Sequence, residues 1–325
     1  MKIAPLYLLF VCVSLFAACT PAADPLPSWA DGSSKDAVLQ WLTAVTAEGG
    51  PDYIPPAGRL AVFDNDGASW CERPQYPSTL FQIELARSLA RQGHLDGTQM
   101  PWPAWFANDR DALEEFGWTD AYRAFTGAFE GMTVEAYADS ARAFMKRTRH
   151  PRWDVALTNL YYAPIIELKD LLEANGFTVW VVTAAEQDFV RTFIDGAFGI
   201  PPEHTMGAWV TPVYNQADDG GVNLVRSDRI VSNGNVHKVE NIFARIGRRP
   251  VFALGNSDND EPMCRYAVTG EHRGLALWVH HDDDEREYAY DDRVGEMADL
   301  CRDQPGAVEI SMRRDWERVF VESGP

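Results

Sequence analysis

The chain has 325 residues, of which 46% are hydrophobic and 24% charged, and its formal net charge is −19. This composition is typical of a globular protein with room for a core and an inserted subdomain. The charge argues against nucleic acid as a partner, because nucleic-acid binding needs a basic footprint. It also means that a site for phosphate must be locally positive against the overall field.

The first residues are typical of an export signal. Lys2 is followed by an apolar run over residues 3–16 and by two alanines before Cys19. A basic start, a short apolar core and small residues before a cleavage site make up such a signal, and the run is too short for a transmembrane helix. The ending resembles a bacterial lipobox, although Phe16 stands where leucine is usual. It implies that residues 1–18 are removed and that Cys19 is lipidated, and a plain cleaved signal is the alternative.

A pair of carboxylates follows the first predicted strand of the folded part. The apolar run Leu60–Phe63 ends in Asp64-Asn65-Asp66-Gly67, which indicates a buried strand that breaks into a tight loop. Such loops at the carboxyl ends of strands carry the ligand site in open α/β sheets. One carboxylate can be a nucleophile and the other an acid/base, with a divalent cation between them. An Asx turn is the alternative for this motif taken alone.

Residues 74–162 are predicted to form an all-helical subdomain inserted after that strand. Apolar residues recur at helical spacing over Phe81–Leu89, and a second helix spans Met132–Met145 with Thr133 as its N-cap. Aromatic residues between them are predicted to form the core of the insert. They are Trp102, Trp105, Phe106, Trp118, Tyr122, Phe125 and Phe129. In the alternative, one or two of them face the site and hold a cationic group by cation–π contact.

Strands and helices alternate after the insert, which predicts a Rossmann-like parallel sheet with helices on both faces. Strands are expected at 177–182, 251–254, 275–279 and 307–311, a hairpin over 209–225, and helices at 163–175, 187–198 and 237–246. The predicted division is a signal over 1–18, a tether and lead-in helix over 19–58, an α/β core over 59–73 and 163–325, and a helical cap over 74–162. The acidic run 282–285 is expected to be a solvated loop.

The cysteines carry little functional information. Cys71, Cys264 and Cys301 form no CxxC pair, so no zinc site is indicated. These three residues allow one disulfide and one free thiol, and the sequence does not select a pairing.

Polar residues mark several strand ends that a parallel sheet brings to one edge. They are Asp64 with Asp66, Thr183, Lys238 at the start of a helix, and the acidic loop over residues 255–260. Taken alone, Thr183 reads as a capping hydroxyl and Lys238 as a solvated lysine. Taken in this order, the set resembles the haloacid dehalogenase-like (HAD) phosphohydrolase superfamily. The resemblance covers residues 60–279 and fits the phosphoserine phosphatase-like branch, which has a helical cap between the first two motifs.

This resemblance implies a reaction through an aspartyl-phosphate. Asp64 would attack phosphorus, and Asp66 would protonate the leaving oxygen and later take a proton from water. Lys238 would supply a fixed positive charge, and Thr183 would hold phosphate oxygens together with nearby backbone N–H groups.

The resemblance also implies a bound Mg²⁺, held by Asp64, Asp66 and the fourth motif. The family usually has aspartate where this chain has Asn256, which binds a cation with less charge, and Asp260 matches the second acid. Asp258 is expected either to bind the metal or to support its ligands. Ala68 stands where threonine is common, which removes a hydroxyl but not the chemistry.

The sequence therefore predicts an exported, Mg²⁺-dependent phosphomonoesterase that acts on small phosphorylated metabolites, on the periplasmic side and anchored as a lipoprotein. Phosphorylcholine-type substrates are conceivable, because exported HAD phosphatases for them exist. The alternative is a binding lipoprotein with the same fold, in which Asn256 has weakened catalysis. Dehalogenase chemistry is a minor alternative, which Asp66 and the Asp-rich fourth motif disfavour. No nucleic-acid partner is expected, and the membrane is contacted only through the lipid anchor.

Overall fold

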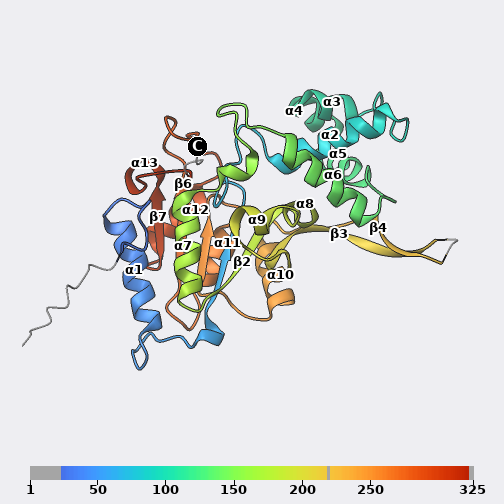
Figure 1. The fold of residues 1–325 in the computed structure, drawn as a ribbon. Helices are drawn as coiled ribbons and strands as arrows, with labels where there is room; N and C mark the ends of the chain where they lie inside the picture. Colours follow the sequence, from blue (N-terminus) through green and yellow to red (C-terminus); the bar gives the residue numbers. More distant parts are fainter. Residues whose placement is uncertain (1–22, 218–219, 322–325) are drawn as a thin grey trace, which may run out of the picture.

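The fold is built on one seven-stranded sheet, and the computed structural model describes residues 23–217 and 220–321 (Figure 1). The strand order is β4-β3-β2-β1-β5-β6-β7. Neighbouring strands are parallel except for β3 and β4, which form an antiparallel hairpin. The strands are β1 (Leu60–Phe63), β2 (Thr178–Glu186), β3 (Thr205–Gln216), β4 (Val222–Val231), β5 (Phe252–Gly255), β6 (Leu275–His280) and β7 (Ala307–Ser311).

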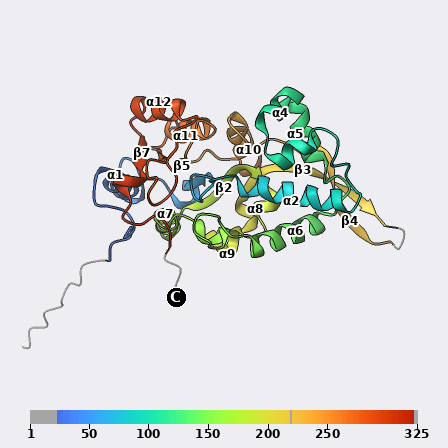
Figure 2. The ribbon, with the colours of Figure 1, turned by 90° about the horizontal axis from the view of Figure 1, so that it is seen from above.

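Helices cover both faces of the sheet, because successive strand residues point to opposite sides. Ala61 and Phe63 of β1 belong to one buried apolar cluster, and Val62 belongs to the other. Figure 2 shows α7 and α9 on one side of the sheet and α10, α11 and α12 on the other. The predicted α/β class with helices on both faces is confirmed. The helices of this core are α1 (Ser33–Thr46), α7 (Ala163–Ala174), α8 (Gln187–Val190), α9 (Ile194–Phe198), α10 (Val236–Ile246), α11 (Glu261–Val268), α12 (Gly295–Asp303) and α13 (Met312–Asp315), with 3-10 helices at Pro56–Gly58, Leu157–Leu160 and Pro202–His204.

A helical insert stands between β1 and β2, to one side of the sheet in Figure 1. Its helices are α2 (Pro77–Arg91), α3 (Trp102–Ala107), α4 (Arg110–Phe116), α5 (Trp118–Gly127) and α6 (Val134–Arg147). The hydroxyl of Thr133 caps α6 by accepting a hydrogen bond from the Ala136 N–H at 3.1 Å. Trp105 and Phe125 stack in the core of the insert, with ring centroids 4.3 Å apart. Tyr122 is the exception among the predicted core aromatics whose burial is described, since 41% of it is exposed.

The β3–β4 hairpin ties the insert to the core. The Gly131 N–H donates to the main-chain oxygen of Arg226 at 2.9 Å, and the Arg226 N–H donates to that of Met132 at 2.8 Å. The Arg226 side chain is buried and forms an ion pair of 2.5 Å with Glu186 at the end of β2. Tyr137 of α6 donates its hydroxyl to the same Glu186 carboxylate at 2.7 Å. The insert is therefore held to the carboxyl edge of the sheet by both main-chain and side-chain contacts.

Two predicted elements differ from the structure. Strand β2 does not stop at Thr183 but runs to Glu186, because β3 continues to pair with it after β1 has turned away into its loop. The helix expected over residues 187–198 is broken into α8 and α9. Between the two helices the main chain tightens, because the Thr192 and Phe193 N–H groups bond to the oxygens of Phe189 and Val190 three residues back, at 3.1 and 3.2 Å.

The acidic run is also different from the prediction of a solvated loop. Asp283 is buried and accepts hydrogen bonds from the side chain of Arg286 and, at 3.2 Å, from its main-chain N–H. Asp282 accepts from the Arg313 N–H at 2.9 Å. The hydrogen bonds of these two carboxylates help to hold the segment after β6 against α13. Asp284 and Glu285 are exposed.

Cys71, Cys264 and Cys301 are all free thiols, so the disulfide that the sequence allowed does not form among them. Cys71 instead donates its thiol to the buried carboxylate of Glu287, with 3.0 Å between sulfur and oxygen.

The predicted export signal and the lipidated Cys19 lie outside the described residues and stay predictions. Within the part of the chain that the structure describes, no helix is both long enough and apolar enough to span a membrane.

Phe63→Ala should lower the free energy of unfolding by about 3–5 kcal/mol, because it leaves a cavity under β1. The Phe63 ring is fully buried and packs against Phe198 and Phe252. Urea unfolding followed by circular dichroism measures the change. Phe243→Ala is the matched control, because Phe243 is 66% exposed on α10. Equal losses for the two variants would contradict this description of the core.

Candidate active site

The loop after β1 is a tight turn held by its own main chain. The Asp64 N–H donates to the Leu254 main-chain oxygen of β5 at 2.9 Å, and the Ser69 hydroxyl donates to that of Asp64 at 2.6 Å. The turn passes through Gly67, whose φ is +78°, a conformation that glycine adopts without strain. A Cβ at this position would also come within 2.0 Å of Asn256 Nδ2. Glycine is thus required both by the turn and by the close approach of the neighbouring loop.

Lys238 lies between two of the predicted site carboxylates. It is 0% exposed, and its Nζ is 2.6 Å from Asp64 Oδ1 and 2.6 Å from Asp260 Oδ1. The third ammonium proton goes to the main-chain oxygen of Val182 at 2.9 Å. Burial lowers the pKa of Lys238, but the charges of Asp260 and Asp64 outweigh it and the net pKa is raised. Lys238 therefore stays a cation that joins α10, β2 and the loops after β1 and β5.

For the Asp64 carboxyl group, burial outweighs the charge of its neighbour Lys238. Burial and the neighbouring charge of Asp260 raise the pKa of Asp64 well above its ordinary value, and the ammonium of Lys238 opposes that shift. The carboxylate at the end of β1 is thus costly to ionise without the lysine, and the lysine is the one fixed charge that favours its anionic form.

Asp66 and Thr183 meet at the same edge of the sheet. The Thr183 hydroxyl donates to Asp66 Oδ2 at 3.3 Å and accepts from the Ala185 N–H at 3.0 Å. Asp66 Oδ1 is buried with no hydrogen-bond partner among the described residues. Burial raises the pKa of Asp66 to about 6, and contacts with Asn65 and Thr183 only partly offset it. A carboxyl group with this pKa can both give and take a proton near neutral pH.

The three predicted site residues in the loop after β5 are Asn256, Asp258 and Asp260, and their side chains have different surroundings. Asp260 uses both carboxylate oxygens within the protein, because Oδ1 binds Lys238 and Oδ2 accepts from the Asn256 and Ser257 N–H groups at 3.0 and 3.2 Å. This arrangement favours a supporting role for Asp260 over direct metal binding. Asp258 is directed elsewhere: its carboxylate accepts from the Met297 N–H at the start of α12, at 3.0 Å. Asp258 therefore caps a helix.

The Asn256 side chain lies between the loop after β1 and Asp260. One of its amide atoms lies 3.3 Å from the Asp66 main-chain oxygen and 3.2 Å from Asp260 Oδ2. If that atom is nitrogen, it donates to both. If it is oxygen, three oxygens converge without a proton between them, which is an arrangement that a cation stabilises.

The donor set fits Mg²⁺ on this basis. Among the described residues, no group of three or more His, Cys, Asp or Glu side chains is placed to hold a metal. A metal here would be held by the Asp66 main-chain oxygen and the Asn256 amide oxygen, which lie 3.3 Å apart when the amide oxygen takes that position, together with the Asp64 carboxylate that the resemblance implies. Mg²⁺ commonly takes one or two carboxylates and keeps several waters, so such a mixed set is sufficient.

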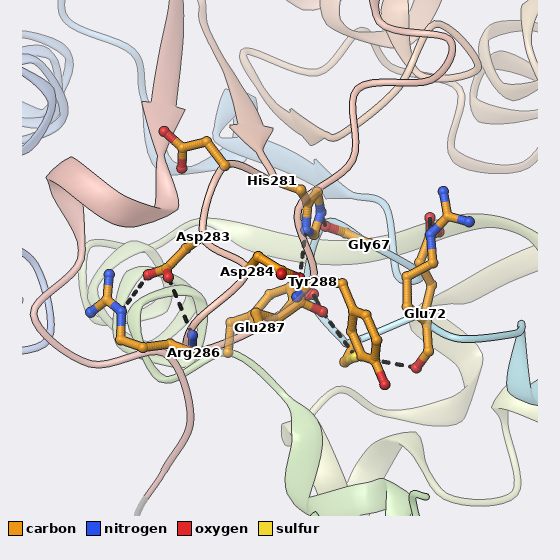
Figure 3. Close-up of polar contacts among 12 residues, drawn as sticks. Gly67, Glu72, His281, Asp283, Asp284, Arg286, Glu287 and Tyr288 are labelled. Atoms are coloured by element: carbon orange, nitrogen blue, oxygen red, sulfur yellow. Dashed lines mark hydrogen bonds and ion pairs between the residues drawn. The ribbon is translucent and has the colours of Figure 1, made fainter. Parts of the chain in front are cut away.

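Glu72 and His281 also belong to this site, and the sequence did not single them out. His281 Nε2 is 2.7 Å from the Gly67 main-chain oxygen, and its Nδ1 is 3.0 Å from Glu287 Oε2 (Figure 3). The two ring nitrogens thus face a main-chain oxygen and a carboxylate oxygen. Burial, together with the charge of Asp66, raises the pKa of Glu72 to about 7. His281 directly follows β6, so its place at a strand end was a usable signal, whereas no pattern marks Glu72.

Comparisons with known proteins give the fold and not the activity. No family model matches the sequence, and no curated protein matches it. A solved conserved protein of unknown function from Anaerococcus prevotii DSM 20548 aligns with 84% of this chain and 90% of its own, at 16% identity and a TM-score of 0.54. Cytosolic 5'-nucleotidase IIIB bound to cytidine aligns with 86% of this chain and 85% of its own, at 11% identity and a TM-score of 0.44. An apo phosphoserine phosphatase aligns with 68% and 86%, at 13% identity and a TM-score of 0.35.

Asp66→Asn should stabilise the metal-free protein in a pH-dependent way. Burial raises the pKa of Asp66 from 3.8 to about 6, so the stability linked to this proton is full below pH 3.8 and is lost as the pH rises through about 6. A shift of this size corresponds to about 2–3 kcal/mol. Urea unfolding in EDTA should therefore show the variant more stable than the wild type near pH 8, with the difference vanishing toward pH 4.

The matched control for that measurement is Asp284→Asn, because Asp284 is exposed. This variant should have the same free energy of unfolding as the wild type at every pH. A wild type that is more stable than Asp66→Asn at all pH values would contradict the buried position of this carboxylate.

Proposed function

We propose that this chain is a phosphomonoesterase of the HAD superfamily that acts on small phosphorylated metabolites through an aspartyl-phosphate. The observation that carries the proposal is the buried ammonium of Lys238 between Asp64 and Asp260, 2.6 Å from each. An anionic nucleophile can approach an anionic phosphate only where a fixed cation offsets the repulsion. The separate environment of Asp66, whose pKa is raised to about 6, supports an acid/base role beside that nucleophile.

In the first half of the reaction, Asp64 attacks phosphorus. A bond forms between its carboxylate oxygen and phosphorus, and the bond from phosphorus to the leaving oxygen breaks. Asp66 gives its proton to that leaving oxygen, so the alcohol departs neutral. The Thr183 hydroxyl, which is 3.3 Å from Asp66 Oδ2, is placed to donate to a phosphate oxygen beside it.

In the second half, Asp66 is ionised and takes a proton from the water that attacks phosphorus. The bond between Asp64 and phosphorus breaks, phosphate leaves, and Asp66 is again protonated for the next cycle. Lys238 remains charged throughout, because its pKa is held high by Asp260 and Asp64.

Asp64, the main-chain oxygen of Asp66 and Asn256 would hold Mg²⁺ in this proposal. When bound, the ion offsets the negative charge of the phosphoryl group. Asp260 would act indirectly, because both of its oxygens already hold Lys238 and the loop after β5.

A binding protein that kept this fold without turnover is the alternative, and Asn256 is the observation that favours it. A neutral amide in place of a carboxylate weakens the attraction for a cation. Against it stands the geometry around Asp64 and Asp66, in which the lysine and the threonine both remain in contact with the two carboxylates.

Asp64→Asn should abolish phosphate release from small phosphomonoesters, lowering kcat by about 10³-fold or more, because the amide is not a nucleophile. The assay uses the chain without its signal, on a panel of esters that includes phosphoserine, nucleoside monophosphates and phosphorylcholine. Each ester is tested with Mg²⁺ and with EDTA.

Asp258→Asn is the control for that assay, because Asp258 caps α12 and should leave kcat within about twofold. Undiminished activity of Asp64→Asn would overturn the mechanism. The absence of any release by the wild type at every Mg²⁺ concentration would favour the binding protein.

We further propose that the protein is exported and anchored through a lipid on Cys19. Support comes from the basic start, the apolar run and the lipobox-like ending of residues 1–18. The full chain, expressed in a bacterium, should incorporate labelled palmitate and partition into the detergent phase, and Cys19→Ser should do neither. Cys301→Ser is the matched control and should behave as the wild type. If the wild type is unlabelled and soluble, the lipid anchor is wrong and residues 1–18 are a plain cleaved signal.

A further inference from the structure

The His281 imidazole joins the segment after β6 to the turn that carries Asp66. His281 directly follows β6 and is 3% exposed. Its Nε2 lies 2.7 Å from the Gly67 main-chain oxygen. Because a carbonyl oxygen can only accept, Nε2 carries a proton and donates to it. The oxygen of the residue after Asp66 is therefore held by a side chain from a different strand end.

The ring is held in turn by a buried carboxylate. Glu287 is 0% exposed, and its Oε2 lies 3.0 Å from His281 Nδ1 (Figure 3). The same oxygen accepts from the Tyr288 N–H at 2.7 Å, whereas Oε1 accepts from the Cys71 thiol at 3.0 Å and from the Tyr162 hydroxyl at 3.4 Å. Both oxygens of Glu287 are thus fixed by other groups, so the carboxylate can orient the ring.

Further contacts limit movement at both ends of this connection. The Tyr290 ring stacks on the imidazole, with ring centroids 4.2 Å apart, and the Tyr290 N–H donates to the His281 main-chain oxygen at 2.9 Å. At the other end, the Gly67 N–H donates to the Trp70 main-chain oxygen at 2.7 Å. Both polar groups of the Gly67 main chain are thus hydrogen-bonded, the oxygen through His281.

A buried polar pair is weak support for stability, because apolar residues of similar volume are often as stabilising. What a satisfied polar network adds is one defined arrangement of the groups that it contacts. Here the contacted group is the peptide that follows Asp66, whose carboxylate accepts from the Thr183 hydroxyl at 3.3 Å. The pair of His281 and Glu287 therefore acts on the turn from which the acid/base candidate projects.

We propose that His281, oriented by Glu287, is a positioning residue for Asp66. By holding the Gly67 oxygen, it fixes the turn in which the Asp66 carboxyl group faces Thr183. Proton transfer needs the acid within hydrogen-bond distance of the leaving oxygen, and a displacement of about 1 Å can cost about 100-fold in rate. This inference rests on the proposed function, since it concerns the acid/base of the same reaction.

Two amide variants separate the two contacts of the ring. His281→Gln places an amide nitrogen about where Nε2 lies, so it can still donate to the Gly67 oxygen. His281→Asn places the nitrogen about where Nδ1 lies, so it keeps the contact with Glu287 and loses the one with Gly67. On the ester that the wild type hydrolyses best, His281→Asn should lower kcat by about 10-fold or more and leave KM within about twofold. His281→Gln should keep kcat within about threefold of the wild type.

His280→Asn is the matched control, because it makes the same change one residue earlier, where the imidazole contacts Glu309 Oε1 at 2.8 Å. It should leave kcat within about twofold. Glu287→Gln tests the orienting carboxylate. Alone it should lower kcat by about threefold or more, and added to His281→Asn it should cause no further loss, because it acts only through the bond from the ring to Gly67.

Hydrogen exchange of the metal-free protein without substrate gives a second readout. The Gly67 and Trp70 N–H groups bond to the main-chain oxygens of Trp70 and Asn65, at 2.7 and 2.9 Å. His281→Asn should speed exchange in the peptide 64–70 by about 10-fold, and His281→Gln should not. Thermal unfolding checks that each variant is folded. If His281→Asn is unfolded, Glu287→Gln carries both measurements, because it preserves the volume of the side chain.

The outcomes separate this inference from the proposed function. Wild-type kcat and exchange in His281→Asn overturn the positioning role. Equal losses in His281→Gln and His281→Asn also overturn it, because they would show that the ring only fills space. If the wild type releases no phosphate, the proposed function fails, and the exchange measurement still decides whether His281 holds the turn.

Discussion

The buried ammonium of Lys238 is the interaction on which the site depends. It is 0% exposed and lies 2.6 Å from both Asp64 and Asp260. Without it, two buried carboxylates would face each other, and removing one partner of a buried ion pair costs about 3–5 kcal/mol. The same lysine binds the main chain of β2 through Val182. One side chain from α10 thus joins β2 and the loops after β1 and β5, and its charge opposes the burial that raises the pKa of Asp64.

The surroundings of that lysine give two neighbouring carboxylates different properties. Asp64 contacts the Lys238 ammonium, whereas Asp66 contacts the Thr183 hydroxyl and has one buried oxygen with no hydrogen-bond partner in the described part of the chain. Burial without a direct ion pair is what raises the pKa of Asp66 to about 6. The turn through Gly67 keeps the two side chains on a rigid strand end, and His281 holds the carbonyl of that glycine from the other half of the sheet. A strand end braced in this way preserves the geometry that proton transfer requires.

Much of the fold follows from local pattern, and several of the deviations arise from contacts between segments that are distant in sequence. Apolar runs closed by Gly or Asp located β1 and β5, because buried parallel strands carry little else. Strand β2 extends beyond its predicted end because its length depends on pairing with β3, a strand that is distant in sequence. The helix predicted over residues 187–198 is two helices, because the main chain between them bonds three residues back and not four. In the acidic run after β6, Asp283 binds the nearby Arg286, whereas Asp282 accepts from the Arg313 N–H, 31 residues away, which no short window of sequence could reveal.

By itself, the sequence determined the α/β class, the helical insert and the strand ends that bring Asp64, Asp66, Thr183 and Lys238 to one edge, because alternation and spacing are local properties of the chain. Only the tertiary structure decided which side chains of the loop after β5 face Asp64 and Lys238. It directed Asp258 to the start of α12 and placed Asp260 against Lys238. Both contacts join segments that are remote in sequence. Burial and charge at such contacts are set by the packed neighbours and not by the residue types alone.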